Sequence, residues 1–497
     1  MGCTRETRVG DASTRRVLRV AQESDAFCLD PQRLNETTTL SVLENIFESL
    51  VTQDSNLKVM PALAAGWETP DERTWRVHLR RGVMFHDGRE MNSTDVKFSY
   101  DRVLASSDSG FRNALNSVES VAVVDPYTVD VKLKEPYGVV ANLGSIYILP
   151  ADYIQGKGEA FFAEHPIGTG PYRFIEWERG ESLRMAAFED YWRGRRADFD
   201  QMVFYPITSA EERLRKLERE EIDIAAQIPF RREPPVNYRT FSEPALHVFY
   251  IGFDVTRPKT PHADTPGNPF RDPRVRHAFL YGIDTGALLD DVFGGRGYVA
   301  TQLVTPSIFG FNPAIKGPRY DLARATELLA EAGYPAGFGA ALTLQFPRRQ
   351  VGQFLQQALS KLNVRLSLDL VSKEEFYRKL DTQDASMYLL GWSCTSGDAS
   401  ELFEYVVHAP DAERRLGIRN VFGYSNPRVD EMFETSIRTV DSKERLKLLQ
   451  DAMVLVMDDL PWMPLYITES IYGVSTKVAW TPRLDDHILG YDAHPHE

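Results

Sequence analysis

The residues best suited to binding chemistry lie together between Trp392 and Asp398. The segment reads WSCTSGD and follows a predicted strand. An aromatic side chain at a strand end, followed by hydroxyl, thiol and carboxylate groups, is typical of ligand pockets, which combine aromatic walls with a few convergent polar groups. We expect a solute to be contacted by four of these side chains, Trp392, Cys394, Thr395 and Asp398. The alternatives are a core position for Trp392 and a helix-capping role for Asp398, because residues 399–407 are expected to be helical.

Residue patterns that would support catalysis are missing from the sequence. We find no H-E-x-x-H, G-x-S-x-G, C-x-x-C or P-loop motif. The loop 168–171 reads GTGP, but no Lys-Ser/Thr follows it and Pro171 lacks a backbone donor for phosphate. Cys394 with a distant histidine would be a thiol nucleophile, but a buried thiol is the simpler interpretation. A hydrolase acting on a small substrate remains the alternative from another functional class.

Metal ligands are sparse in the sequence. His408, in the segment after Glu404, is the only histidine in a suitable position. A single imidazole does not make a chelating site. We therefore expect neither a metal nor another cofactor.

Further candidate ligand residues follow other predicted strands. Asp25 and Phe27 come directly after the first predicted strand of the chain. Arg348 and Arg349 stand between a predicted strand and a predicted helix, where a solvated basic turn is the alternative interpretation. Tyr466 is an aromatic residue near the end of another predicted strand.

Separated segments of the chain predict the elements that position these residues. They are residues 61–96 (PALAAGWETPDERTWRVHLRRGVMFHDGREMNSTDV), 168–192 (GTGPY, then W, G and YW), 221–224 (EIDI), 272–297 (DPRVRHA, then ID and GGRG) and 320–334 (YD, then EAGY). Trp75, Val77 and Leu79 alternate with polar residues, as in a half-buried strand. Between residues 342 and 392 the predicted order is strand, helix, strand, helix, strand. This order favours a parallel sheet with its ligand edge at the carboxyl ends of the strands.

These segments, in this order over about residues 17–472, resemble the family 5 extracellular solute-binding proteins of oligopeptide, dipeptide and nickel ABC transporters. The resemblance implies an α/β, bilobal fold of the type II periplasmic-binding-protein kind (cluster C) with an extra inserted domain. It implies an extracytoplasmic receptor that captures a peptide or a peptide-sized organic solute in an interlobe cleft. Hinge closure would follow, with delivery to the permease subunits of an ABC importer.

The same resemblance implies a division of the chain into lobes. Lobe I would be discontinuous, and its pieces are 17–40, 165–245 and 468–497. The inserted domain II would span 41–164, and lobe III would span 246–467.

Thr395 departs from the family's pattern. In peptide-binding members an aspartate stands three residues after this tryptophan and binds the α-ammonium group of the peptide. A hydroxyl cannot make the same charge-assisted bond. In dipeptide-type members an arginine in the neighbourhood of Arg348 and Arg349 binds the ligand carboxylate. An oligosaccharide or another non-peptide solute is therefore the alternative ligand.

The N-terminus begins Met1-Gly2-Cys3, and glycine before cysteine is how a bacterial lipoprotein signal ends. Together with the resemblance, this favours a signal peptide that has been removed, a lipid on Cys3 and a polar tether over 1–16. The protein would be periplasmic or on the cell surface, and the lipid would be its only membrane contact. A cytosolic start with an incidental cysteine is the alternative.

Composition excludes some partners. The chain of 497 residues carries a formal net charge of −14 and no evident basic face, so we expect no nucleic-acid partner. No apolar run approaches the roughly 20 residues that a membrane-spanning helix needs. We expect a monomer. Cys28 and Cys394 are expected to be unpaired thiols, although an oxidising compartment would permit a disulfide.

Overall fold

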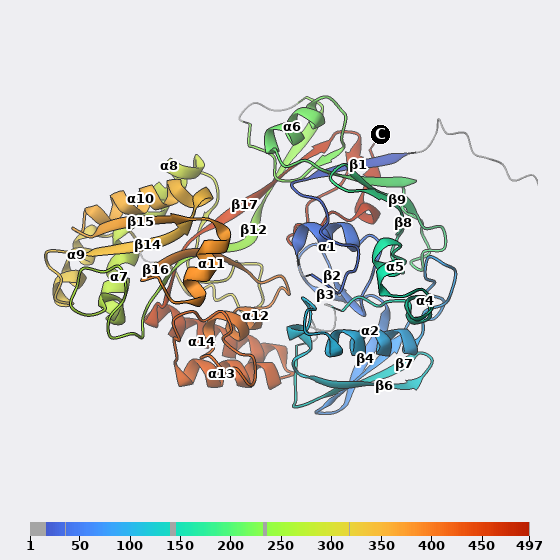
Figure 1. The fold of residues 1–497 in the computed structure, drawn as a ribbon, viewed down its shortest axis with the longest axis horizontal. Helices are drawn as coiled ribbons and strands as arrows, with labels where there is room; N and C mark the ends of the chain where they lie inside the picture. Colours follow the sequence, from blue (N-terminus) through green and yellow to red (C-terminus); the bar gives the residue numbers. More distant parts are fainter. Residues whose placement is uncertain (1–15, 35, 140–145, 232–235, 318, 497) are drawn as a thin grey trace, which may run out of the picture.

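The chain folds into two bodies that are joined by long strands (Figure 1). The computed structural model describes residues 16–34, 36–139, 146–231, 236–317 and 319–496. We call residues 246–467 the C-terminal body and the remaining described residues the N-terminal body. Cys3 and nearly all of the predicted tether lie outside the described residues.

One sheet runs through both bodies. Its shorter strands are β1 (Val17–Gln22), β8 (Tyr172–Glu178), β9 (Ser182–Ala187), β10 (Gln201–Pro206), β11 (Ile224–Ala225), β13 (Tyr298–Val299), β14 (Gly339–Gln345), β15 (Arg365–Val371) and β16 (Met387–Ser393), and its longest are β12 (Tyr238–Phe253) and β17 (Trp462–Ser475). The strand order is β15-β14-β16-β12-β17-β11-β1-β10-β9-β8, with β13 beside β17. The sheet therefore changes body at the pair β12 and β17.

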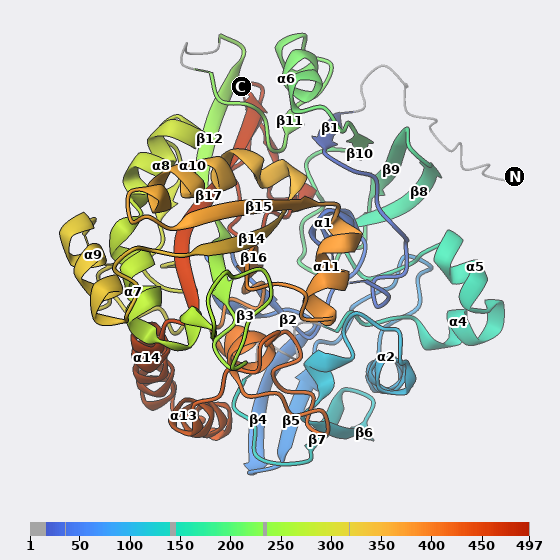
Figure 2. The same ribbon diagram turned by 60° about the vertical axis from the view of Figure 1, so that its left-hand side comes forward.

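The antiparallel pair β12 and β17 connects the two bodies (Figures 1 and 2). Its register is interrupted between Pro244 and Val248 and again after Phe249. The sequence predicts only the apolar halves of these strands, because the halves in the N-terminal body carry polar residues such as Ser242 and Glu469. The predicted lobe boundaries at 245/246 and 467/468 fall inside the two strands, and the division into lobes stays a prediction.

The predicted parallel layer of the C-terminal body is confirmed. β14 pairs in parallel with both β15 and β16. The helices around this layer are α7 (Pro273–Gly282), α8 (Thr285–Phe293), α9 (Leu322–Glu331), α10 (Arg349–Ser360) and α11 (Lys373–Asp381), and α13 (Pro427–Arg438) and α14 (Ser442–Asp459) pack together below it (Figure 2). A mainly aliphatic and aromatic core fills the space between the layer and its helices.

The strand predicted at Trp75, Val77 and Leu79 is also confirmed, in the N-terminal body. It belongs to a four-stranded sheet of β4 (Ala64–Asp71), β5 (Thr74–Leu79), β7 (Thr128–Leu133) and β6 (Val118–Asp125). Helix α2 (Ser93–Ala105) begins with a capping box. The side chain of Asn92 accepts a hydrogen bond from the backbone of the first helical turn, and the side chain of Asp95 accepts one from the backbone N–H of Asn92. This sheet lies far from the long strands (Figure 1).

The remaining elements are short. They are α1 (Thr37–Leu43), β2 (Val51–Gln53), β3 (Val59–Pro61), η2 (Asn113–Leu115), α4 (Ala151–Lys157), α5 (Glu159–Glu164), α6 (Ala210–Glu218), η3 (Pro269–Arg271), η4 (Phe346–Arg348), α12 (Ser400–Leu402), η5 (Phe403–Val407), β18 (Val478–Ala479), η6 (Gly490–Asp492) and β19 (His494–Pro495). Helix α1 is shorter than the helix that the apolar pattern of residues 39–50 predicts. The helix expected over 399–407 is a single α-helical turn followed by a π-helical turn.

Within the described residues, no helix is both long enough and apolar enough to cross a membrane. Cys28 and Cys394 are both free thiols, so the expectation that they are unpaired is confirmed.

Candidate functional site

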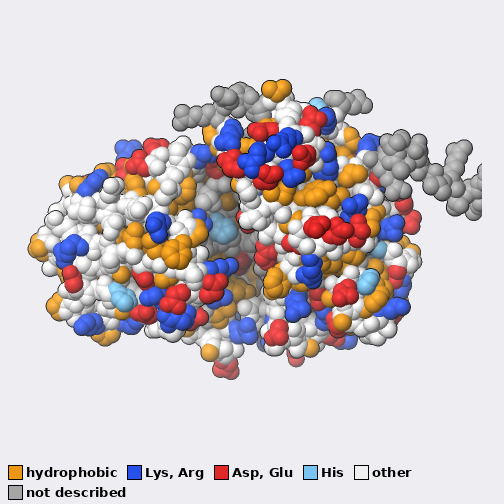
Figure 3. Space-filling view, turned by 45° about the horizontal axis from the view of Figure 1, so that its top comes forward, with side chains coloured by type: hydrophobic (Ala, Val, Ile, Leu, Met, Phe, Trp, Pro, Cys, Tyr) orange, Lys and Arg blue, Asp and Glu red, His pale blue; other side chains and the backbone are white. Residues whose placement is uncertain are grey.

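A cavity of about 170 Å³ lies between the two bodies. The N-terminal body contributes one wall, which includes Thr37, Gln53, Phe111 and Tyr147 together with the C-terminal residues Arg483, Asp485 and His487. The C-terminal body contributes the other wall, whose residues are Thr395, Ser396, Ser400, Glu401, Glu404 and Tyr405. The molecular surface is visibly hollowed between the bodies (Figure 3). A solute in this cavity would touch both bodies at once.

The wall from the C-terminal body is formed by the loop after β16 and the turns that follow it. The carboxylate Oε2 of Glu401 accepts hydrogen bonds from Ser396 N at 2.9 Å and Ser396 Oγ at 2.8 Å. Glu404 and Tyr405 belong to the π-helical turn η5. π-Helical turns are uncommon and occur frequently at functional sites. The turn presents Glu404 and Tyr405 on the cavity side, next to Glu401.

Glu401 and Glu404 are partly buried acids with raised pKa values. Burial raises the pKa of Glu401 to about 7, against the lowering effect of the hydrogen bonds from Ser396. Burial, with an addition from the carboxylate of Glu401, raises the pKa of Glu404 to about 7. Among the described residues, neither carboxylate has a Lys, Arg or His nitrogen within 4.0 Å. The two acids therefore line the cavity without a cationic partner from the described part of the chain.

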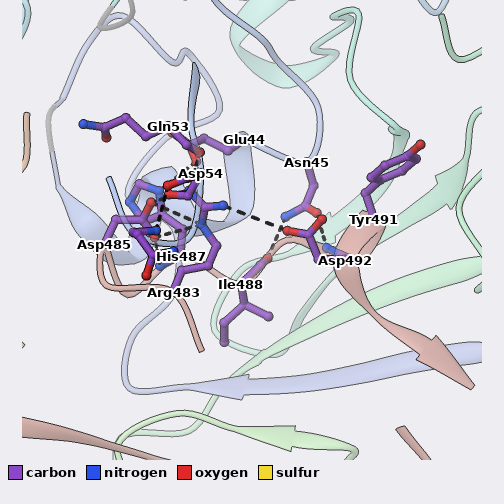
Figure 4. A network of polar contacts seen from close by, with 12 residues as sticks. Glu44, Asn45, Gln53, Asp54, Arg483, Asp485, His487, Ile488, Tyr491 and Asp492 are labelled. Atoms are coloured by element: carbon purple, nitrogen blue, oxygen red, sulfur yellow. Dashed lines mark hydrogen bonds and ion pairs between the residues drawn. The ribbon is translucent and has the colours of Figure 1, made fainter. Parts of the chain in front are cut away.

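The opposite wall carries a paired network of charges (Figure 4). The guanidinium of Arg483 contacts the carboxylate of Asp485 at 2.6 Å and donates to the carbonyl oxygen of Gln53 at 2.9 Å. His487 Nδ1 lies 2.7 Å from Glu44 Oε2. Arg483 and His487 on this wall thus each have a carboxylate partner. Glu401 and Glu404 on the opposite wall have no such partner of opposite charge among the described residues.

The protonation of His487 follows from this network. Burial alone would lower its pKa, but the carboxylates of Glu44 and Asp485 raise the pKa of His487 to about 9. The pKa of Asp485 is lowered despite its burial, because His487 and Arg483 stabilise the carboxylate. With a pKa of about 9, His487 is protonated at neutral pH.

A second cavity of about 410 Å³ adjoins the first near the connecting strands. Thr37 lines both cavities. The second is lined by residues of both bodies, among them Gln22, His247, Thr468, Glu469 and Asp486. The pockets that hold drug-sized ligands are usually about 300–1,000 Å³. The first cavity alone is smaller than this, so a peptide-sized solute would need both cavities or a wider separation of the bodies.

The two bodies also contact each other directly. Gln53 Nε2 donates to the carbonyl oxygen of Ser396 at 2.6 Å, and Gly138 N donates to that of Ile437 at 2.6 Å. Arg438 also lies 3.1 Å from Glu135 across the interface. Of these residues, Gln53 and Ser396 line the first cavity, so their contact lies at its rim.

Of the four predicted ligand residues at and after the end of β16, only one lines the first cavity. Thr395 lines the cavity. Trp392 does not, but its ring lies 5.8 Å from that of Tyr405, which does. Cys394 is buried in the hydrophobic core of the C-terminal body, and burial raises its pKa well above the usual range of a thiol. Asp398 is buried, pairs with Arg445, and accepts a hydrogen bond from Ser400 N at 2.9 Å.

The other predicted ligand residues line neither cavity. Both oxygens of Asp25 accept hydrogen bonds from Trp177 Nε1, and Phe27 is exposed on the surface. Arg349 is exposed at the start of α10. Arg348 lies over the ring of Phe249 at 4.4 Å.

Tyr466 is fully buried, and its ring stacks on Phe249 at 4.9 Å. The ring of His247, which lines the second cavity, also stacks on Phe249, at 5.9 Å. Arg348 and Tyr466 thus both contact Phe249, which in turn contacts the cavity residue His247.

Several cavity residues were not predicted from the sequence. Glu401 and Glu404 lie in the stretch expected to be an ordinary helix, where a spacing of three residues places two acids on one face. That spacing was a usable signal. Arg483, Asp485 and His487 come from the C-terminal segment after β17, and no local pattern connects them with residues about 85 positions earlier.

Metal binding finds no support in the geometry. Within the described part of the chain, no group of three or more His, Cys, Asp or Glu side chains could hold a metal ion. His408 is buried, with Nδ1 2.7 Å from the carbonyl oxygen of Ala409 and Nε2 3.2 Å from Glu434. It lies outside both cavities.

Known proteins resemble this chain over nearly its full length. The sequence model of the bacterial extracellular solute-binding proteins, family 5, matches residues 58–413. The glutathione-binding protein GsiB of Salmonella choleraesuis (strain SC-B67) is 29% identical over 497 residues, which cover 95% of this chain and 93% of that protein.

Solved structures share the fold. The periplasmic binding protein DppA of Helicobacter pylori, in complex with the peptide STSA, superposes with a TM-score of 0.79 at 24% identity, covering 97% of this chain and 99% of that one. HbpA2 of Haemophilus parasuis superposes with a TM-score of 0.84 at 23% identity, covering 97% of this chain and all of that one.

The family match extends over most of the chain, and the bilobal α/β fold agrees with it. The members of this family are receptors rather than enzymes, and they act outside the cytoplasm. The protein belongs to the bacterial extracellular solute-binding proteins of family 5 and is a substrate-binding receptor of an ABC importer.

Proposed function

We propose that the protein captures a peptide or a peptide-sized organic solute in the cavity between its two bodies and delivers it to the permease of the importer. The observation that supports this most strongly is the two-sided lining of the cavity. The loop and turns around Thr395 and Glu401 in one body face Gln53, Tyr147 and Arg483 of the other across it. A solute that contacts both walls stabilises the arrangement in which the walls are close together.

The connecting strands are suited to such a closure. β12 and β17 are the pair that carries the sheet from one body to the other, and their register is interrupted at the crossing point. An interrupted ladder is a natural place for a bend, because fewer hydrogen bonds oppose it. We propose that the bodies rotate about this point to admit and release the solute.

The charges of the cavity favour a polar, charged solute over a neutral sugar. Its lining includes four carboxylates and two cationic groups, so the walls carry fixed charge that a neutral oligosaccharide cannot complement. A short peptide carries both an ammonium and a carboxylate group. The relative GsiB is named for binding glutathione, which is a tripeptide of this kind.

Calorimetry with defined solutes tests the proposal. Tri- to pentapeptides, glutathione and maltotriose would be titrated into the protein and into Thr395→Trp, whose larger side chain would fill the cavity. Thr326→Trp, on the exposed face of α9, is the matched control. We expect a peptide to bind the wild type and the control but not Thr395→Trp. Equal binding by all three proteins would place the solute elsewhere.

We also propose that Cys3 carries a lipid anchor and that the receptor is a monomer. The Gly2-Cys3 dipeptide and the polar stretch after it support the anchor, and the extracytoplasmic family makes it compatible with the compartment. Metabolic labelling with a fatty-acid analogue in a bacterial host tests the anchor. The protein, expressed behind a lipoprotein signal peptide, should be labelled, and the labelling should be lost in Cys3→Ser.

A further inference from the structure

We propose that Glu401 and Glu404 bind a cationic amino group of the solute, in place of the carboxylate that Thr395 does not provide. The inference rests on the proposed function, because it concerns which solutes the same cavity accepts. It assigns a binding role to two residues that follow the family's usual position by six and nine residues.

The geometry of Glu401 suits this role. Ser396 donates to one oxygen, Oε2, from its backbone N–H and from its hydroxyl, and so fixes the orientation of the carboxylate. An ionised carboxylate has about four acceptor sites, so capacity remains for a ligand donor. Glu404 follows three residues later and lines the same cavity, which places two acceptors beside each other.

The balance of charge in the cavity points to a cation. Glu44 and Asp485 are paired with His487 and Arg483 on one wall. Behind the other wall the buried Asp398 is paired with Arg445, while the lining residues Glu401 and Glu404 have no ion-pair partner among the described residues. Buried charges in proteins are normally paired. A cationic group from the solute would complete the pairing.

Aromatic rings around the same cavity favour the same kind of group. Phe111, Tyr147 and Tyr405 all line it. The negative face of an aromatic ring attracts an ammonium group, most strongly where water is excluded. Two acids and three rings around one enclosed space suit an organic cation better than they suit a neutral or anionic group.

Without the solute, protons occupy these acids part of the time, since burial raises the pKa of both to about 7. A bound ammonium group favours the ionised carboxylates, so binding near neutral pH should release protons to the solvent. The other titratable or charged groups near the pair are Asp398 with its partner Arg445, the thiol of Cys394 and the phenols of Tyr405 and Tyr137. Across the cavity the pair faces the network of Glu44, Arg483, Asp485 and His487.

The experiment compares free and N-acetylated solutes. Glutathione, trialanine and the peptide STSA would be titrated in both forms by calorimetry into the wild type, Glu401→Gln/Glu404→Gln and Glu413→Gln. Glu413 is exposed and outside the cavity, so its substitution controls for net charge. Acetylation removes the cation from the solute, which leaves the test independent of whether the double variant folds.

We expect acetylation to weaken binding to the wild type and to Glu413→Gln by about tenfold or more. In Glu401→Gln/Glu404→Gln the free and acetylated forms should bind with similar affinity. Wild-type titrations in buffers of different ionisation enthalpy should show proton release for the free form only.

Two results would overturn the inference and leave the proposed function intact. One is equally tight, cavity-dependent binding of acetylated and free solutes. The other is undiminished discrimination by the double variant. If none of these solutes binds, the solute that the purified protein releases on denaturation is identified instead. A released solute without a basic nitrogen overturns the inference but not the proposed function, and one with a basic nitrogen supports the inference. Absence of any bound or binding solute overturns the proposed function as well.

Discussion

Asp398 and Arg445 form a bidentate ion pair directly beneath the loop that carries Thr395 and Ser396. The contacts are 2.5 Å and 2.7 Å long, and the side chains are only 10% and 7% exposed. The same carboxylate caps the first turn of α12 through Ser400 N. The pair therefore fixes the position from which Glu401 and Glu404 reach the cavity.

Removal of the charge at Asp398 should be costly for stability. In Asp398→Asn the guanidinium of Arg445 would be left buried without its anion, and such a loss costs about 3 kcal/mol or more in the free energy of unfolding. Asp451→Asn is the control, because Asp451 pairs with Lys447 on the exposed surface of α14, where a pair is worth less than about 1 kcal/mol. Urea denaturation measures both. Equal losses would show that the buried pair is not important for the fold.

The raised pKa values of Glu401 and Glu404 predict a dependence of stability on pH. Their pKa values are about 7 in the folded protein, above the ordinary value of a carboxyl group in the unfolded chain. The folded state therefore holds more protons than the unfolded state between these values. The resulting stabilisation is present at about pH 4.5 and is lost as the pH rises through about 7.

Thermal unfolding of the ligand-free protein at several pH values measures this effect. The difference in melting temperature between the wild type and Glu401→Gln/Glu404→Gln should change in favour of the variant between about pH 5.5 and about pH 8. The difference between the two proteins isolates these acids from other titrating groups. A difference that is constant with pH would contradict the raised pKa values.

At the scale of elements, β12 is held between β16 and β17 by close packing across the sheet. Gly252 in β12 lies opposite Tyr388 in β16, and a Cβ atom at Gly252 would lie 2.3 Å from the tyrosine ring. Tyr388 is fully buried and is hydrogen-bonded to Trp462 Nε1 in β17 at 3.0 Å. The ring has little freedom to move, so the glycine is required for this approach.

Gly252→Ala should therefore destabilise the protein by about 1–3 kcal/mol. Gly66→Ala in β4 is the matched control, because a Cβ atom there would meet nothing within 4 Å and its backbone has an ordinary φ. The control should be neutral within about 1 kcal/mol. Chemical denaturation of both variants provides the measurement, and a neutral Gly252→Ala would mean that β12 and β16 can separate without cost.

The elements were largely predictable from the sequence, and the exceptions have physical reasons. Helix α9, with Asp321 as its cap and Gly333 at a φ of 90°, follows from local patterns. The full lengths of β12 and β17 do not, because half of each strand pairs through the backbone while its side chains are polar. The short α1 ends early because the chain must turn at Asn45, whose side chain is bonded to the carbonyl oxygen of Ile488, far away in sequence.

The site was predictable only in part for a related reason. A strand followed by a polar loop indicated the cavity wall at Thr395, but the sequence does not show which loop side chains turn inward. Cys394 turns inward because it packs in the hydrophobic core, and Asp398 turns inward because it pairs with Arg445. The opposite wall depends on the return of residues 483–487 to the N-terminal body, which is a property of the tertiary structure.

At the scale of the whole molecule, the two bodies touch at the rim of a cavity that is smaller than a peptide. Admission of a solute therefore requires the rim contacts, such as Gln53 with Ser396, to separate. Because one solute contacts both walls, its binding should favour the closed arrangement.

Small-angle X-ray scattering with and without solute measures this closure. A peptide that binds should lower the radius of gyration of the wild type and of Thr326→Trp. In Thr395→Trp, where the cavity is filled, the same peptide should leave the radius unchanged. A radius that does not respond to a solute of proven affinity would exclude a rotation about β12 and β17 as part of capture.

The most direct test of the central claim is the identity of the solute that the protein retains. The protein would be purified without denaturation, and the molecules released from it on unfolding would be identified by mass spectrometry. The account predicts an intact, peptide-sized solute that carries a free amino group and that is absent from the same preparation of Thr395→Trp. A retained solute of another kind, or one found equally with Thr395→Trp, would contradict it.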